Sequence, residues 1–163
     1  MTASKCSTSV TAGWRCWRPR SVLTPLLLLD LNDCLLVKEL PPEIGQLTAL
    51  ISLRLAGCSL EELPPQIGQL AALSFLGLVG CPLKELPPQI GQLTALTHLI
   101  LNGCTLKELP PQIGQLLALG YLDLDHCNQL TLAPGAEVGQ PAQTIVAAYV
   151  PLLIVEADTG TIR

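Results

Sequence analysis

The chain has few aromatic residues, few charged residues and no long uninterrupted apolar stretch. Aromatic residues make up 3% of the 163 positions and charged residues 13%, whereas 49% are hydrophobic. A core built from this composition must therefore be aliphatic. The longest apolar run, residues 145–155, is interrupted by Pro151 and is shorter than the roughly 20 residues that a membrane helix needs. We expect one domain without a membrane span.

Basic residues are also in short supply. Nine Lys and Arg stand against thirteen Asp and Glu, which gives a net charge of -4. Binding to nucleic acid or to an anionic membrane needs an excess of positive charge. The composition therefore predicts that the partner is not a nucleic acid.

Signatures of catalysis and metal binding are missing as well. The sequence has no phosphate-binding GxxxxGK[ST], no GxSxG and no HExxH, and its seven cysteines form no CxxC or CxxH pair. His98 has no nucleophile at a motif spacing, and Asp123 and Asp125 alone supply too few oxygens for calcium. We expect no enzyme, no cofactor and no metal ion.

What the chain does contain is an internal repeat of 23 residues. Three copies begin ELPPQIGQL, at residues 62, 85 and 108, and an earlier copy begins ELPPEIGQL at residue 39. The cysteines that keep the same period are Cys58, Cys81, Cys104 and Cys127. Cys34 precedes Cys58 by 24 residues, so the first unit has one extra residue. Such a period is typical of a solenoid, in which each unit packs on its neighbours.

Each unit reads as a short strand followed by a turn and an irregular segment. Leucines alternate with a polar residue in 53–55, which indicates a strand buried on one face. The proline pair at residues 64–65 prevents a strand there, because proline has no N–H to donate to the hydrogen bonds between strands. The spacing of Ile67 and Leu70 suits one helical or 3-10 turn, in which Gly68 can take a positive φ at little cost.

The repeating pattern LxxLxLxxCxLxxLPPxIGQLxA resembles the leucine-rich-repeat family over residues 26–132. Its degenerate first copy uses Leu26, Leu29, Leu31, Cys34 and Leu36. The LPPxIGQL half is similar to the intracellular subclass found in Ras-binding scaffolds, plant disease-resistance receptors and Roco-type repeat domains. The resemblance implies an α/β solenoid of about five short parallel strands with irregular or 3-10 convex segments. It also implies a non-catalytic module for protein–protein interaction.

Five cysteines occupy one repeat position, where many members of this family carry Asn. A thiol can donate a weaker hydrogen bond to the neighbouring turn and packs as a small apolar group. We expect these cysteines to be buried, reduced and free of metal. Unpaired thiols suit a reducing compartment, which predicts a cytoplasmic location.

Residues between the buried leucines should face out on the concave side of the sheet. The first outward column holds Leu28, Ser52, Phe75, His98 and Tyr121, and its aromatic members should form one stripe. Exposed aromatic rings beside polar groups are typical of binding hot spots. The predicted partner-binding residues are Arg54, Phe75, His98, Ile100, Asn102, Tyr121, Asp123 and Asp125.

The two ends lack the repeat. Residues 1–25 are interpreted as a disordered tail or a poor cap, in which Trp14 and Trp17 could cover the first leucines. Residues 1–29 hold four basic residues and no acidic residue until Asp30, so organelle targeting is the alternative. Residues 133–163 are interpreted as a C-terminal cap, with a helix after Pro141 and a short strand at 152–155.

Three functions are compatible with these patterns. The first is a monomeric protein-binding module of intracellular signalling, whose partner no motif identifies. The second is the repeat part of a larger signalling enzyme or receptor, such as a Roco-type GTPase or a nucleotide-binding resistance protein. The third is an inert product of repeat expansion, because recent duplication would leave near-identical PPQIGQL copies.

Overall fold

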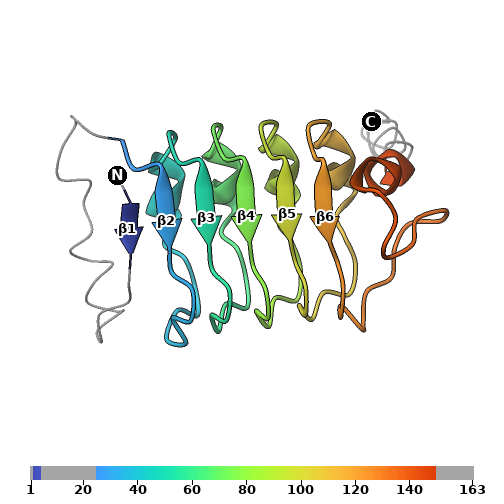
Figure 1. The fold of residues 1–163 in the computed structure, drawn as a ribbon, viewed down its shortest axis with the longest axis horizontal. Coiled ribbons are helices and arrows are strands. Elements are labelled where there is room, and N and C mark those ends of the chain that lie inside the picture. Colours follow the sequence, from blue (N-terminus) through green and yellow to red (C-terminus); the bar gives the residue numbers. More distant parts are fainter. Residues whose placement is uncertain (1, 5–24, 150–163) are drawn as a thin grey trace, which may run out of the picture.

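The structure is a computed structural model that describes residues 2–4 and 25–149 of the chain. Its strands are β1 (Thr2–Ser4), β2 (Leu28–Asp30), β3 (Ser52–Arg54), β4 (Phe75–Gly77), β5 (His98–Ile100) and β6 (Tyr121–Asp123). They form one parallel sheet in sequence order (Figure 1). The 3-10 segments are η1 (Pro42–Gln46), η2 (Pro65–Gln69), η3 (Pro88–Gln92) and η4 (Pro111–Gln115). Strands β2–β6 confirm the predicted solenoid, and β1 adds a strand from outside the repeats.

The leucines of the repeat form the core between the sheet and the 3-10 segments. The middle residues of β3, β4 and β5 are Leu53, Leu76 and Leu99, and all three are fully buried. Each lies in register with the next across the sheet. A single unit could not bury its own leucines, so burial in this core requires the stack.

The convex side consists of the 3-10 segments stacked on one another. In η2, Pro64 is extended and Pro65 begins the segment, where its missing N–H costs no hydrogen bond. Gly68 does not adopt the positive φ that glycine would allow at this position. A Cβ at Gly68 would lie 2.6 Å from the carbonyl oxygen of Gln89 in the next unit. Glycine is therefore needed at this position for the close approach of two backbones.

Positive φ occurs instead in the turn that follows each strand. Gly57, Gly80 and Gly103 have φ values of 69°, 68° and 72°. Asp33 and His126 hold the same place in the first and last units, at 60° and 58°. Glycine adopts this conformation without the steric cost that other residues meet, so the turn explains the glycines of the inner units.

The repeated cysteines form a ladder of thiol hydrogen bonds between units, as the sequence predicted. The thiols of Cys81, Cys104 and Cys127 donate to carbonyl oxygens one unit earlier, at Sγ–O distances of 3.1, 3.2 and 3.1 Å. Burial raises the pKa of Cys104 to about 12, and the neighbouring thiols Cys127 and Cys81 raise it further. The thiol therefore stays protonated and remains a donor at neutral pH.

The first unit departs from the predicted core. Leu36 was expected to be buried, but it is 63% exposed, and Val37 at 2% exposure takes its place. Cys34 lies three residues before Val37 rather than two, so the extra residue of this unit is accommodated here. The last unit uses the same spacing, since Leu130 follows Cys127 by three and packs against the core.

After the repeats, residues 142–149 form a helix that packs against the last unit. Its side chains Ile145, Val146 and Tyr149 are buried, and the Tyr149 hydroxyl accepts the Ala133 N–H at 3.1 Å. None of the helices in residues 25–149 is long and apolar enough to cross a membrane. The predicted strand at 152–155, the proposed cover by Trp14 and Trp17, and most of the possible targeting segment lie outside the described residues.

Candidate functional site

Parallel register brings the first outward column together on the concave face. Leu28 pairs with Ser52, Ser52 with Phe75, Phe75 with His98, and His98 with Tyr121. These positions alternate with the buried leucines, so they face away from the core. The predicted aromatic stripe therefore exists as a geometric feature of the sheet.

The three rings of this stripe contact one another in sequence. The ring centroids of Phe75 and His98 are 6.2 Å apart and inclined by 31°. Those of His98 and Tyr121 are 5.9 Å apart and inclined by 36°. Both distances lie within the range of favourable aromatic pairs. We call Phe75, His98 and Tyr121 the ring ladder.

A charged pair extends the ring ladder toward the N-terminal end of the sheet. The guanidinium carbon of Arg54 lies 5.6 Å from the centroid of Phe75, which allows a cation–π interaction. Arg54 Nη1 also lies 3.8 Å from Oδ2 of Asp30. The pair is partly exposed, so its main effect is to hold the guanidinium over the ring rather than to stabilise the fold.

Two neighbours determine how the rings lie. Gly77 leaves room for Phe75, because a Cβ there would come within 3.1 Å of the Cε1 atom of the ring. Thr97 Oγ1 is 2.9 Å from Nδ1 of His98 and also donates to the carbonyl oxygen of Ser74 at 2.9 Å. Since the hydroxyl has only one proton, this geometry assigns the donating N–H to Nδ1 and makes Nε2 the acceptor of the neutral ring.

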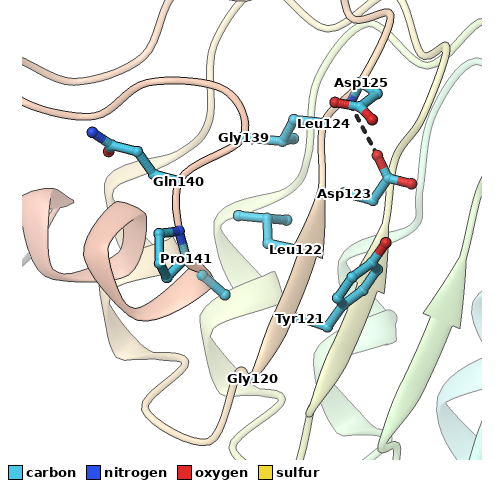
Figure 2. Close-up of a pocket in the computed structure, with 10 residues that line it drawn as sticks. Gly120, Tyr121, Leu122, Asp123, Leu124, Asp125, Gly139, Gln140 and Pro141 are labelled. Atoms are coloured by element: carbon cyan, nitrogen blue, oxygen red, sulfur yellow. Dashed lines mark hydrogen bonds between the residues drawn. The ribbon is translucent and has the colours of Figure 1, made fainter.

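At its β6 end, the ring ladder borders two carboxylates and a cavity. Asp123 lies in the second column beside Ile100, and its Oδ1 accepts the N–H of Asp125 at 3.0 Å. A cavity of about 350 Å³ lies between β6 and residues 139–142 (Figure 2). Tyr121, Asp123 and Asp125 line its β6 side, and half of the Tyr121 side chain is exposed.

The predicted residues share one face, but they do not form one contact network. Arg54 joins the ring ladder, whereas Asp123 and Asp125 form a separate acidic group at β6. Ile100 and Asn102 lie beside the rings and are partly buried. In the described part of the chain, no group of three His, Cys, Asp or Glu could hold a metal ion.

Sequence reasoning left two parts of this face out of the site. Asp30 shares the column of Arg54 and pairs with it, and an acidic residue next to a basic one in register was the available signal. The wall formed by 139–142 has no counterpart in the repeat, so no periodic signal could place it.

A second hollow, of about 500 Å³, lies on the convex side among the prolines and Glu62, Glu85 and Glu108.

Comparison with known families decides the identity of the repeat. A family model described as a leucine-rich repeat region matches residues 66–139. This match supports a leucine-rich-repeat family for the chain. The narrower intracellular subclass stays a prediction. A comparison with curated proteins finds no significant match.

Two solved receptor structures are similar to about two thirds of the chain. A plant peptide hormone receptor, RGFR1 in complex with RGF2, is 33% identical, with a TM-score of 0.59. The ectodomain of the Arabidopsis thaliana receptor kinase GASSHO1/SCHENGEN3, in complex with CASPARIAN STRIP INTEGRITY FACTOR 2, is 23% identical, with a TM-score of 0.51. The second likeness concerns the fold alone. Each match covers 66% of this chain and 18% of the receptor chain, so the chain spans about a fifth of either receptor.

Proposed function

We propose that this leucine-rich-repeat chain is a non-catalytic protein-binding module whose partner lies across the concave face. The surface comprises Arg54, Phe75, His98, Ile100, Asn102, Tyr121, Asp123 and Asp125. The observation that carries the proposal is the ring ladder, a continuous row of partly exposed rings on a rigid sheet. A chain with only 3% Phe, Trp and Tyr places two of these residues, Phe75 and Tyr121, on either side of His98, where they are not needed for the core.

The charge distribution along the face suits recognition. Aromatic rings at the centre offer area that is favourable to desolvate, and the charged groups at either end can determine orientation. The basic group is Arg54, held by Asp30 and Phe75, and the acidic group is Asp123 with Asp125. A partner that spans the ladder would meet the Arg54–Asp30 ion pair at one end and the carboxylates of Asp123 and Asp125 at the other.

The likeness to a receptor solved with a peptide ligand supports an interaction role for these repeats. The buried thiol ladder suits a reducing compartment, which favours intracellular signalling and a cytoplasmic location. The second candidate is that the repeats form the recognition part of a larger receptor. The likeness to the peptide hormone receptor at 33% identity favours it, because that match involves only 18% of the receptor chain.

The test uses the full chain as bait in an extract of its own cells, followed by affinity measurements on the purified captured protein. We expect Phe75→Ala or Tyr121→Ala to weaken binding by about 1–3 kcal/mol, or roughly 5- to 150-fold. Thr94→Ala is the matched control, since this exposed residue lies just past η3 and outside the sheet. Equal affinity of all variants, or a loss confined to Thr94→Ala, would contradict the concave assignment.

A further inference from the structure

Among the described residues, β6 is the last strand of the sheet, and its outer edge pairs with no other strand. On its inner edge, Tyr121 N donates to Thr97 O at 3.0 Å and Leu101 N donates to Asp123 O at 2.9 Å, and Thr97 and Leu101 directly flank β5. In a parallel ladder, the intervening residues 122 and 124 present their amides to the opposite side. Among the described residues, the N–H groups of Leu122 and Leu124 have no acceptor.

The column of buried leucines also ends at β6. Leu53, Leu76 and Leu99 are fully buried, whereas Leu122 at the end of the row is only partly buried. The 23-residue period would place a seventh strand near residue 144, but residues 142–149 form a helix instead. The cavity of about 350 Å³ beside β6 is the space that this strand would have entered (Figure 2).

The first repeat shows how an acidic strand on this sheet receives its neighbour. On β2, Oδ1 of Asp30 accepts the N–H of Asn32 at 3.1 Å, which leaves Oδ2 to face Arg54 of β3 at 3.8 Å. The side-chain oxygen of Asn32 then accepts the N–H of Ala56 at 2.8 Å. The Asp30 side chain thus faces the basic group of Arg54. The Asn32 side chain accepts the backbone N–H of Ala56, two residues after that arginine.

The strand β6 carries the same arrangement without its neighbour. Oδ1 of Asp123 accepts the N–H of Asp125 at 3.0 Å, as Oδ1 of Asp30 accepts that of Asn32. Asp125 takes the place of Asn32 and also has side-chain oxygens that can accept an amide. Within the described residues, no Lys or Arg forms an ion pair with Asp123 or Asp125.

We propose that the β6 edge binds an extended peptide segment of another protein as a seventh parallel strand. An aliphatic residue of the peptide packs over Leu122, and the basic residue that follows it lies beside Asp123. The peptide N–H two residues after the basic one donates to Asp125. This inference rests on the proposed function, because Tyr121, Asp123 and Asp125 belong to the same binding surface.

A second copy of the chain fits this edge less well than a peptide does. Stacking end to end would bring β1 of the next copy onto β6. Ser4 pairs with Asp30 in this sheet, so the same register would place a neutral serine, not a basic residue, beside Asp123. The helix 142–149 also occupies the last unit, where a whole second solenoid would have to pack.

The chain itself supplies the probe for a test. A synthetic peptide with the sequence of residues 49–57, ALISLRLAG, places its Arg beside Asp123 when its central Leu lies over Leu122. Titration into the isotope-labelled full chain, followed by NMR, should shift the amides of Leu122 and Leu124. The absence of these shifts at millimolar peptide would overturn the proposal, as would concentration-dependent shifts there without peptide.

Two N-methylated peptides distinguish pairing with the β6 edge from nonspecific binding. In β3, the amide of Ser52 donates toward β2 and that of Leu55 donates toward β4, so the Arg amide faces β2 and the amide of the preceding Leu faces β4. Methylating the Arg amide should therefore weaken binding about tenfold or more. Methylating the preceding Leu amide is the matched control and should leave most of the affinity. Equal effects of the two would overturn the seventh strand.

A charge exchange tests the register. Asp123→Asn should lower the affinity by about two- to fivefold, as expected for an exposed ion pair. Asp123→Arg should reject the Arg peptide and accept one with Glu in place of Arg. Failure of that exchange would refute the pairing with Asp123. Loss of the cellular partner on Phe75→Ala is measured separately, so either the edge or the ring ladder can fail alone.

Discussion

The convex and concave sides of this solenoid repeat with the same period but obey different constraints. Segments η2, η3 and η4 have one sequence, PQIGQ. The equivalent concave positions hold Phe75, His98 and Tyr121. On the convex side each unit rests on the backbone of the next, whereas on the concave side the side chains border solvent.

This difference shows where substitution is tolerated in the molecule. A convex glycine faces a carbonyl oxygen of the neighbouring unit, which cannot move without disturbing the stack. A concave ring can turn or be replaced while the leucines beneath it stay buried. The scaffold therefore leaves the concave face free to vary.

The largest effect should come from placing a charge in the interior that both sides share. Cys81 is fully buried and donates to the carbonyl oxygen of Leu55. Cys81→Asp should lower the free energy of unfolding by about 3–5 kcal/mol, because it buries an uncompensated carboxylate beside a carbonyl acceptor. Urea denaturation followed by circular dichroism measures the change.

Cys81→Asn is the control for that substitution, since it keeps a neutral donor of similar size. We expect it to cost about 1 kcal/mol, the scale of one altered hydrogen bond. If the Asp and Asn variants were equally stable at neutral pH, the thiol position would be far better solvated than its burial indicates.

A smaller effect should follow from breaking the convex packing. Gly68→Ala would place a methyl group 2.6 Å from the Gln89 carbonyl oxygen and 2.5 Å from Gln92 Oε1. The side chain can move aside, but the backbone oxygen cannot, so we expect a loss of about 1–3 kcal/mol. Thermal unfolding of the variant measures this loss. An unchanged melting temperature would show that the stacked 3-10 segments are loosely packed at Gly68.

The sequence predicted the parts of the fold that repetition dictates. The strands β2–β6, the buried leucines and the thiol ladder follow from a period that any one unit shares with the next. For Gly68, the sequence suggested only that a positive φ was possible in the turn within one unit, and the structure does not use it. The reason for this glycine is the Gln89 carbonyl oxygen of the neighbouring unit, which only the stacked structure reveals.

For the candidate site, the sequence predicted the columns but not the contacts across them. Parallel strands in register placed Phe75 beside His98, so the stripe could be derived from the repeat alone. The cation–π contact of Arg54 depends on the diagonal lean of its side chain, which register does not specify. The hollow beside β6 depends on where the non-repeating segment 139–142 runs, and no pattern encodes that path.

The smallest effect should come from the matched glycine on the concave side. A Cβ at Gly77 would meet only the edge of the Phe75 ring, at 3.1 Å to Cε1 and 3.5 Å to Cζ. Alanine in a strand gains about 0.5–1 kcal/mol over glycine, and displacing the ring offsets part of that gain. We therefore expect Gly77→Ala to change the free energy of unfolding by less than about 0.5 kcal/mol in either direction.

A double-mutant cycle with Phe75→Ala tests whether displacement of the Phe75 ring offsets the gain from alanine at position 77. Without the ring, the added methyl group meets nothing else within 4 Å, so Gly77→Ala should stabilise the variant by the full gain of about 0.5–1 kcal/mol. A coupling energy near zero would mean that Phe75 does not lie over Gly77. A loss as large as that of Gly68→Ala would remove the contrast between the two sides, because both glycines would then be needed for packing.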